Sequence, residues 1–209
     1  MLTISIKQGK EKSLLDRQPW IYLSAIERVD GRAAEKRQPG ATALVRSSSG
    51  KFLARAGWSP QSQIRARVWT FDEHEAVDHA LFKRRIKAAV AARTPRGKGS
   101  VAAVPIVAGE QDQLPGLRVD WIGGIPGFLV CQFQAAGVDA WKVPIVQALM
   151  AETGCPNVYE WSDELVRRAE GLPVARGTLA GDVPPDSMLT AIEGGLLSVA
   201  EPGTSSRRG

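Results

Sequence analysis

Short hydrophobic runs that alternate with polar residues fill the first 72 residues, and this period changes at Asp72. The run Leu2–Lys7 alternates strictly, Thr42–Arg46 and Lys51–Ala56 flank a serine-rich turn, and Ile64–Phe71 alternates again. An alternation of period two is typical of a strand with one buried face. Several short strands at regular spacing predict a small β-barrel.

A helix and then a linker follow the predicted strands. Apolar residues in Asp72–Arg93 recur at helical spacing, and Thr94–Ser100 has the composition of a linker. Beyond it, strand candidates at Leu117–Trp121 and Phe128–Phe133 precede a helical pattern over Ala140–Glu152. The second half is therefore predicted to be a small mixed α/β domain.

These patterns predict an α+β chain: an N-terminal β-barrel, a connecting helix and a mixed α/β domain. Hydrophobic residues are 44% of the chain and charged residues 23%, which is enough apolar material for a buried core. The polar stretch Asp30–Gly40 is predicted to be a loop. The predicted units are residues 1–72, a connecting helix and linker at 73–99, a domain at 100–190, and a disordered tail at 191–209.

Charge is divided unevenly between the two halves. Residues 1–98 hold 20 Lys/Arg and 9 Asp/Glu, a net +11, whereas residues 99–209 hold 7 Lys/Arg and 13 Asp/Glu, a net −6. A basic half beside an acidic half indicates two functional units, the first facing a polyanion such as RNA. The alternative is a basic protein that binds no anion.

Two groups of residues are candidates for RNA contact. Ile64–Phe71 would place basic and aromatic side chains on one face, and arginines pair with phosphates while aromatic rings stack on bases. A second basic group surrounds the turn at Gly9 and can position a phosphate backbone. Alternatively, the cations are simply solvated and Trp69 packs on the next helix. The candidates are Lys10, Lys12, Arg17, Arg65, Arg67 and Trp69.

Catalytic and metal-binding patterns are missing from the sequence. Cys131 alternates with core residues, Cys155 has no evident activating base, and His74 and His79 are spaced poorly for a shared metal. We therefore predict no catalytic residue and no metal ligand. No apolar run is long enough for a membrane helix and the N-terminus has no signal core, so we expect a cytoplasmic protein without a membrane partner.

Several distinctive runs lie between residues 3 and 190. They are Lys10–Ile21 (KEKSLLDRQPWI), Ala54–Pro60 (ARAGWSP), Gln63–Phe71 (QIRARVWTF), Phe82–Ile86 (FKRRI), Gly109–Leu117 (GEQDQLPGL), Val119–Asp120, and Val158–Glu160 leading to Gly171–Leu172. Together these runs resemble one family, the 23S rRNA (cytosine-5) methyltransferases, whose N-terminal domain is a PUA domain.

The resemblance implies a PUA-like barrel, 23S rRNA as partner and S-adenosylmethionine as the cofactor of full-length members. Members continue into a Rossmann-like domain that binds this cofactor and carries the catalytic cysteine. Here the sequence after Val199 is unlike the family, so we expect a chain truncated before that domain, with no cofactor of its own. Two positions also depart from the pattern: Gln113 replaces a usual glycine, and Trp161 a usual basic residue.

Three functions follow as hypotheses. The first is an RNA-recognition portion of such a methyltransferase that does not catalyse alone. The second is a methyltransferase fragment that acts with a separate catalytic chain. The third is a remnant interaction protein without an RNA role, whose charge asymmetry drives self-association; a homodimer is left open.

Overall fold

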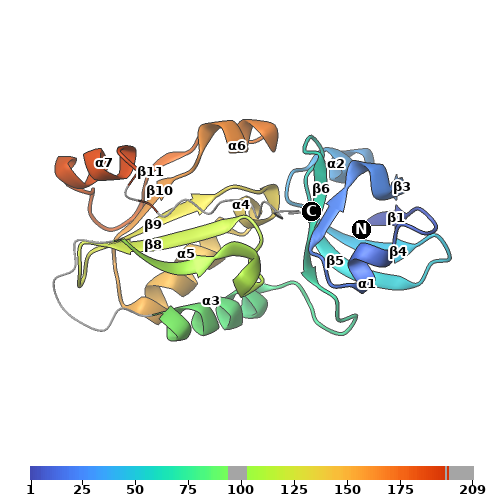
Figure 1. The fold of residues 1–209 in the computed structure, drawn as a ribbon, viewed down its shortest axis with the longest axis horizontal. Helices are drawn as coiled ribbons and strands as arrows, with labels where there is room; N and C mark the ends of the chain where they lie inside the picture. The colour runs from blue at the N-terminus through green and yellow to red at the C-terminus, as the bar shows by residue number, and fades with distance from the viewer. Residues whose placement is uncertain (94–102, 196, 198–209) are drawn as a thin grey trace, which may run out of the picture.

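The computed structural model describes residues 1–93, 103–195 and 197, and it is a mixed α/β structure with two sheets. The N-terminal unit, residues 1–72, lies beside the C-terminal unit, residues 79–93 and 103–193 (Figure 1). Strand order is β2-β6-β5-β4-β1-β3 in the first sheet and β11-β10-β9-β8-β7 in the second. Among the described residues, no strand pairing joins the two sheets.

The N-terminal unit is one curled six-stranded sheet with short helices at its margin. All neighbouring strands are antiparallel except β1 and β4, which pair in parallel with Leu2 opposite Ala43. Its elements are β1 (Leu2–Ile6), α1 (Lys12–Leu15), β2 (Trp20–Tyr22), η1 (Leu23–Ala25), β3 (Ile26–Asp30), α2 (Ala33–Arg37), β4 (Thr42–Ser47), β5 (Phe52–Trp58) and β6 (Ile64–Thr70).

The C-terminal unit is a five-stranded sheet with helices on both faces. Helices α3 and α5 cover one face, and α7 packs on the other through Ile192 (Figure 1). Its elements are α3 (His79–Arg93), β7 (Val104–Ala108), η2 (Gly109–Asp112), β8 (Leu117–Ile122), β9 (Phe128–Phe133), α4 (Ala136–Ala140), α5 (Lys142–Thr153), β10 (Val158–Trp161), α6 (Glu164–Ala169), β11 (Arg176–Ala180) and α7 (Asp186–Glu193).

The two units have separate cores that meet at β6. Ala66 and Val68 point into the core of the first sheet, while Trp69 belongs to the core of the second. The predicted connecting helix is α3, and its buried residues Phe82 and Ile86 belong to that second core. The helix is thus an integral part of the C-terminal unit. The predicted linker Thr94–Ser100 and most of the tail at 191–209 lie outside the described residues.

Candidate nucleic-acid interface

Helix α1 presents the first group of candidate residues to solvent. Lys10, Lys12 and Arg17 are all exposed, whereas Leu14 of the same segment is buried in the first core. The buried Leu14 anchors the helix, whereas Leu15 and the three cations on and beside the helix are exposed. The structure therefore gathers these three cations in one segment that can lie along a phosphate backbone. The carboxylates of Glu11 and Asp16 belong to the same segment, so its net charge is +1.

Arg17 has an unusual backbone conformation at the end of helix α1. Its φ is +62°, in the left-handed region that side chains other than glycine rarely adopt. The N–H of Arg17 donates to Leu14 O and that of Gln18 to Ser13 O, the two hydrogen bonds that end a helix in a Schellman motif. The guanidinium carbon of Arg17 then lies 5.0 Å from the centre of the Phe71 ring.

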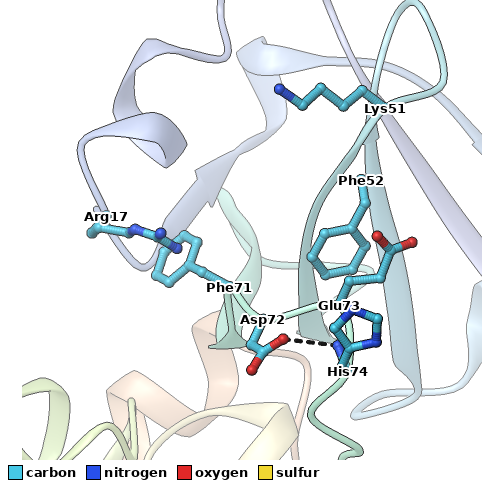
Figure 2. A pocket seen from close by; sticks show the side chains of 7 residues that line it. All are labelled: Arg17, Lys51, Phe52, Phe71, Asp72, Glu73 and His74. Carbon is cyan, nitrogen blue, oxygen red and sulfur yellow. Dashed lines mark hydrogen bonds between the residues drawn. The ribbon is translucent and has the colours of Figure 1, made fainter.

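An open hollow of about 580 Å³ adjoins Arg17 (Figure 2). Arg17 and Phe71 lie together on one side, and Phe52 with His74 on the other. Strands β5 and β6 are antiparallel, so the start of β5 at Phe52 lies beside the end of β6. The lining residues are Arg17, Lys51, Phe52, Phe71, Asp72, Glu73 and His74.

The sequence patterns do not point to Lys51, Phe52 or the two acidic residues of this hollow, Asp72 and Glu73. Phe52 lies inside a predicted strand, and its position opposite Phe71 depends on the register of β5 against β6. The serine-rich turn before Lys51 predicts an antiparallel hairpin of β4 with β5. No comparable signal in the sequence fixes β6 on the other edge of β5.

The second candidate group, on β6, faces the C-terminal unit. Arg67 Nη1 donates to Glu170 Oε1 at 2.9 Å, and the two side chains are 14% and 3% exposed. Trp69 is 2% exposed and meets Phe82 edge-on with ring centres 5.0 Å apart. Trp69 thus packs on the next helix, as in the alternative interpretation, and neither side chain offers a free surface to RNA in this conformation.

Arg65 occupies an intermediate position on the same strand. It is half-buried, and its Nη1 donates to the backbone oxygen of Pro60. The prediction that Arg65 contacts RNA stays open, as do those for Lys10, Lys12 and Arg17.

Glu170 is the buried carboxylate that ties the two units together. Besides Arg67, its Oε2 accepts from Ser59 Oγ at 2.8 Å and from the backbone N–H of Ala136 at 3.2 Å. Ser59 and Arg67 belong to the N-terminal unit, and Ala136 and Glu170 to the C-terminal one. Three donors satisfy a carboxylate that would otherwise be costly to bury.

Among the described residues, neither a metal-binding cluster nor a cysteine thiolate is found. No group of three or more His, Cys, Asp or Glu among them could hold a metal ion. Cys131 and Cys155 are buried, and burial raises the pKa of both thiols, so neither is held as a thiolate. Within residues 1–93 and 103–195, no helix is long and apolar enough to cross a membrane.

Comparison with known proteins identifies the relatives of this chain. Residues 4–71 match the PUA-like domain family, which confirms a PUA-like N-terminal unit. Ribosomal RNA large subunit methyltransferase I of Cronobacter sakazakii is 43% identical over 189 residues, 90% of this chain and 46% of the relative. The protein of the same name from Aliivibrio fischeri is 39% identical over 199 residues, 95% and 48% of the two chains.

This chain is homologous to ribosomal RNA large subunit methyltransferase I over most of its length. It spans about half the length of the curated relatives it matches. A solved structure, a putative SAM-dependent methyltransferase from Streptococcus mutans, has the same fold over 89% of this chain and 45% of its own, with a TM-score of 0.68 and 15% identity.

S-adenosylmethionine does not fit the one edge of the second sheet where a nucleotide cofactor would be expected. Such cofactors bind beyond the carboxyl ends of parallel strands, next to a glycine-rich turn into a helix. The parallel pair is β9 and β10, and the links that follow them, Gln134–Ala135 and Ser162–Asp163, contain no glycine.

The buried side chain of Arg167 fills that edge instead. Its Nη1 donates to Phe133 O and to Asp139 Oδ1, both at 2.8 Å. Burial alone would raise the pKa of Asp139, but its bonds to Arg167 and Lys142 lower the pKa further than burial raises it. The edge is thus closed by ionised, mutually paired side chains that brace the fold.

Proposed function

We propose that the described residues form the RNA-recognition portion of an S-adenosylmethionine-dependent 23S rRNA cytosine-5 methyltransferase of the cytoplasm. The curled sheet of the N-terminal unit acts as the barrel of a PUA domain. The observation that carries the proposal is the exposed cationic segment Lys10–Arg17 within the PUA-like match. Homology to large-subunit rRNA methyltransferases supports RNA as its partner.

The C-terminal unit has a bracing role in this proposal. Its sheet edge is closed by Arg167, and its Glu170 anchors Arg67 of the N-terminal unit. The cationic segment is therefore held at a fixed position relative to the second sheet. Such a fixed position lets RNA bound at α1 be presented in one orientation, as substrate positioning requires.

The first prediction concerns the phosphate contacts. Binding of 23S rRNA fragments should weaken as salt rises, with a log–log slope of about −0.7 for each single-strand phosphate contact. Replacing both Lys10 and Lys12 by alanine should therefore lower the affinity and reduce the slope by about 1.4. Arg37→Ala, which removes an exposed cation of α2, is the matched control and should leave both unchanged.

Arg17→Gly separates RNA binding from stability. Glycine is the residue that a left-handed helix end favours, so this change should leave the fold as stable as the parent or more so, while weakening RNA binding. Gln113→Gly removes the same left-handed backbone strain, at φ +57° in the C-terminal unit, and should not alter the affinity for RNA.

The proposal fails if the parent does not bind rRNA fragments, or if the lysine pair and Arg17→Gly bind like the parent at every salt concentration. Arg65→Ala is tested alone. Arg67→Ala is unsuitable for this purpose because it also removes the partner of Glu170.

A further inference from the structure

The hollow beside α1 has features that a phosphate site would lack. Two of its lining side chains are cations, Arg17 and Lys51, and two are carboxylates, Asp72 and Glu73. The formal charges of these four groups cancel. A phosphate entering the hollow would meet both carboxylates, so the site is suited to a group without net charge.

Two of its walls are flat and apolar. Phe52 and Phe71 are each half-buried, and the guanidinium of Arg17 lies over the Phe71 ring (Figure 2). The guanidinium carbon of Arg55 lies over the Phe52 ring, 5.8 Å from its centre, so a base has to stack on the other face of that ring. Unpaired RNA bases stack on aromatic rings and on arginine guanidinium planes alike. The volume of the open hollow, about 580 Å³, falls within the range of roughly 300–1,000 Å³ found for small-molecule sites in general.

The wall between the rings is held in place before any ligand arrives. Asp72 Oδ1 accepts from the backbone N–H of His74 at 2.8 Å. Arg55 Nη2 donates to the backbone oxygen of Glu73 at 2.9 Å. These bonds fix the backbone that carries the polar groups, and a pre-formed site loses less entropy on binding.

We propose that this hollow binds one unpaired nucleobase of the RNA, stacked on Phe52 and faced by the Arg17–Phe71 pair. The carboxylates of Asp72 and Glu73 accept hydrogen bonds from the N–H groups at the base edge. Lys51, exposed at the rim, and the cations Lys10 and Lys12 contact the adjoining phosphates. This inference rests on the proposed RNA-binding function and adds a base-specific site to it.

The test uses the full chain and an RNA hairpin with 2-aminopurine at one unpaired loop position, moved along the loop in a series. At one position, binding should quench the fluorescence because the base stacks. Phe52→Leu keeps an apolar contact but removes the ring, so it should abolish that quenching and weaken binding about 5- to 150-fold. Phe52→Trp should restore both.

Three controls make the outcome specific. Tyr22→Leu removes an exposed ring near the opposite end of β6, where Tyr22 pairs with Ile64, and should behave like the parent. Phe52→Leu should keep the salt dependence of the parent, since stacking releases no counterions. Thermal unfolding should show that Phe52→Leu remains folded at the assay temperature.

The outcomes distinguish this inference from the proposed function. If the parent binds RNA with the expected salt slope but Phe52→Leu binds and quenches as the parent does, the base site is wrong while the RNA-binding function stands. If the parent binds RNA but no loop position shows quenching, the base site is likewise wrong while the RNA-binding function stands. If the parent binds no RNA at all, both proposals fall.

Discussion

Trp69 shows why a single side chain cannot be assigned to a surface when only its strand is known. It alternates with inward-facing residues of β6 and therefore points away from the first core. That outward face is covered by the C-terminal unit, where the ring lies against Phe82 and close to Gly137. The alternation predicts the direction of the side chain but not what lies beyond it.

Trp69→Ala should consequently act on stability. Removing a buried tryptophan leaves a cavity and typically costs about 3–5 kcal/mol of the free energy of unfolding. Denaturant unfolding measures this, and Trp69→Phe should recover much of the loss because the indole N–H has no hydrogen-bond partner among the described residues. RNA affinity measured well below the melting temperature should stay near the parent value. A Trp69→Ala protein that is as stable as the parent but binds RNA weakly would instead indicate that Trp69 contacts RNA.

Gln113 illustrates what a resemblance adds to residue patterns. The family pattern has glycine there, and the structure places Gln113 at φ +57° as the residue that ends η2. The resemblance thus points to a left-handed turn that periodicity alone does not reveal. At Trp161, the other departure, the guanidinium carbon of Arg176 lies 3.8 Å from the centre of the tryptophan ring. The neighbouring strand β11 therefore supplies a cation at this surface.

At the scale of elements, helices and strands are predicted best where one buried face gives the sequence a regular hydrophobic period. Strands β4, β5 and β6 match their predicted ranges within two residues, and Pro144 lies in the first turn of α5 as proline requires. Helix α2 lies within the predicted loop Asp30–Gly40 and escapes prediction, because its five residues include none that is buried and hence form no apolar stripe. The hollow escapes prediction because it depends on strand register.

The contact between β5 and α4 depends on two glycines. A Cβ on Gly57 would lie 2.9 Å from Gly137 Cα, which is backbone and cannot move aside. Gly57→Ala should therefore force the two elements apart and cost about 1–3 kcal/mol, measured by denaturant unfolding. Gly194→Ala, at the exposed end of α7 with φ −75°, is the control. Its Cβ would lie 3.2 Å from Thr190 O, a contact that the exposed helix end can relax, so stability should change by less than about 0.5 kcal/mol. Equal stability of both variants would show that the elements pack less closely than described.

For the whole molecule, the two sheets meet through an interface that both units need. Trp69 of the N-terminal unit completes the second core, and Glu170 of the C-terminal unit takes donors from Ser59 and Arg67. Separating the two units would expose the indole of Trp69 and would leave the carboxylate of Glu170 without its donors Ser59 and Arg67. The two units are thus expected to fold as one cooperative structure despite their separate sheets.

Calorimetry tests this cooperativity directly. The parent should unfold in one transition, with the calorimetric enthalpy equal to the van't Hoff enthalpy. Arg67→Ala should destabilise it by about 3–5 kcal/mol, because Glu170 stays buried without its cation. Adding Glu170→Gln to Arg67→Ala should recover part of that loss, since a neutral amide no longer needs the cation, and the double-mutant cycle measures the coupling. Two resolved transitions in the parent would mean that the sheets fold independently. Additive effects of the two substitutions would mean that the Arg67–Glu170 pair is not coupled and does not fix the cationic segment relative to the second sheet.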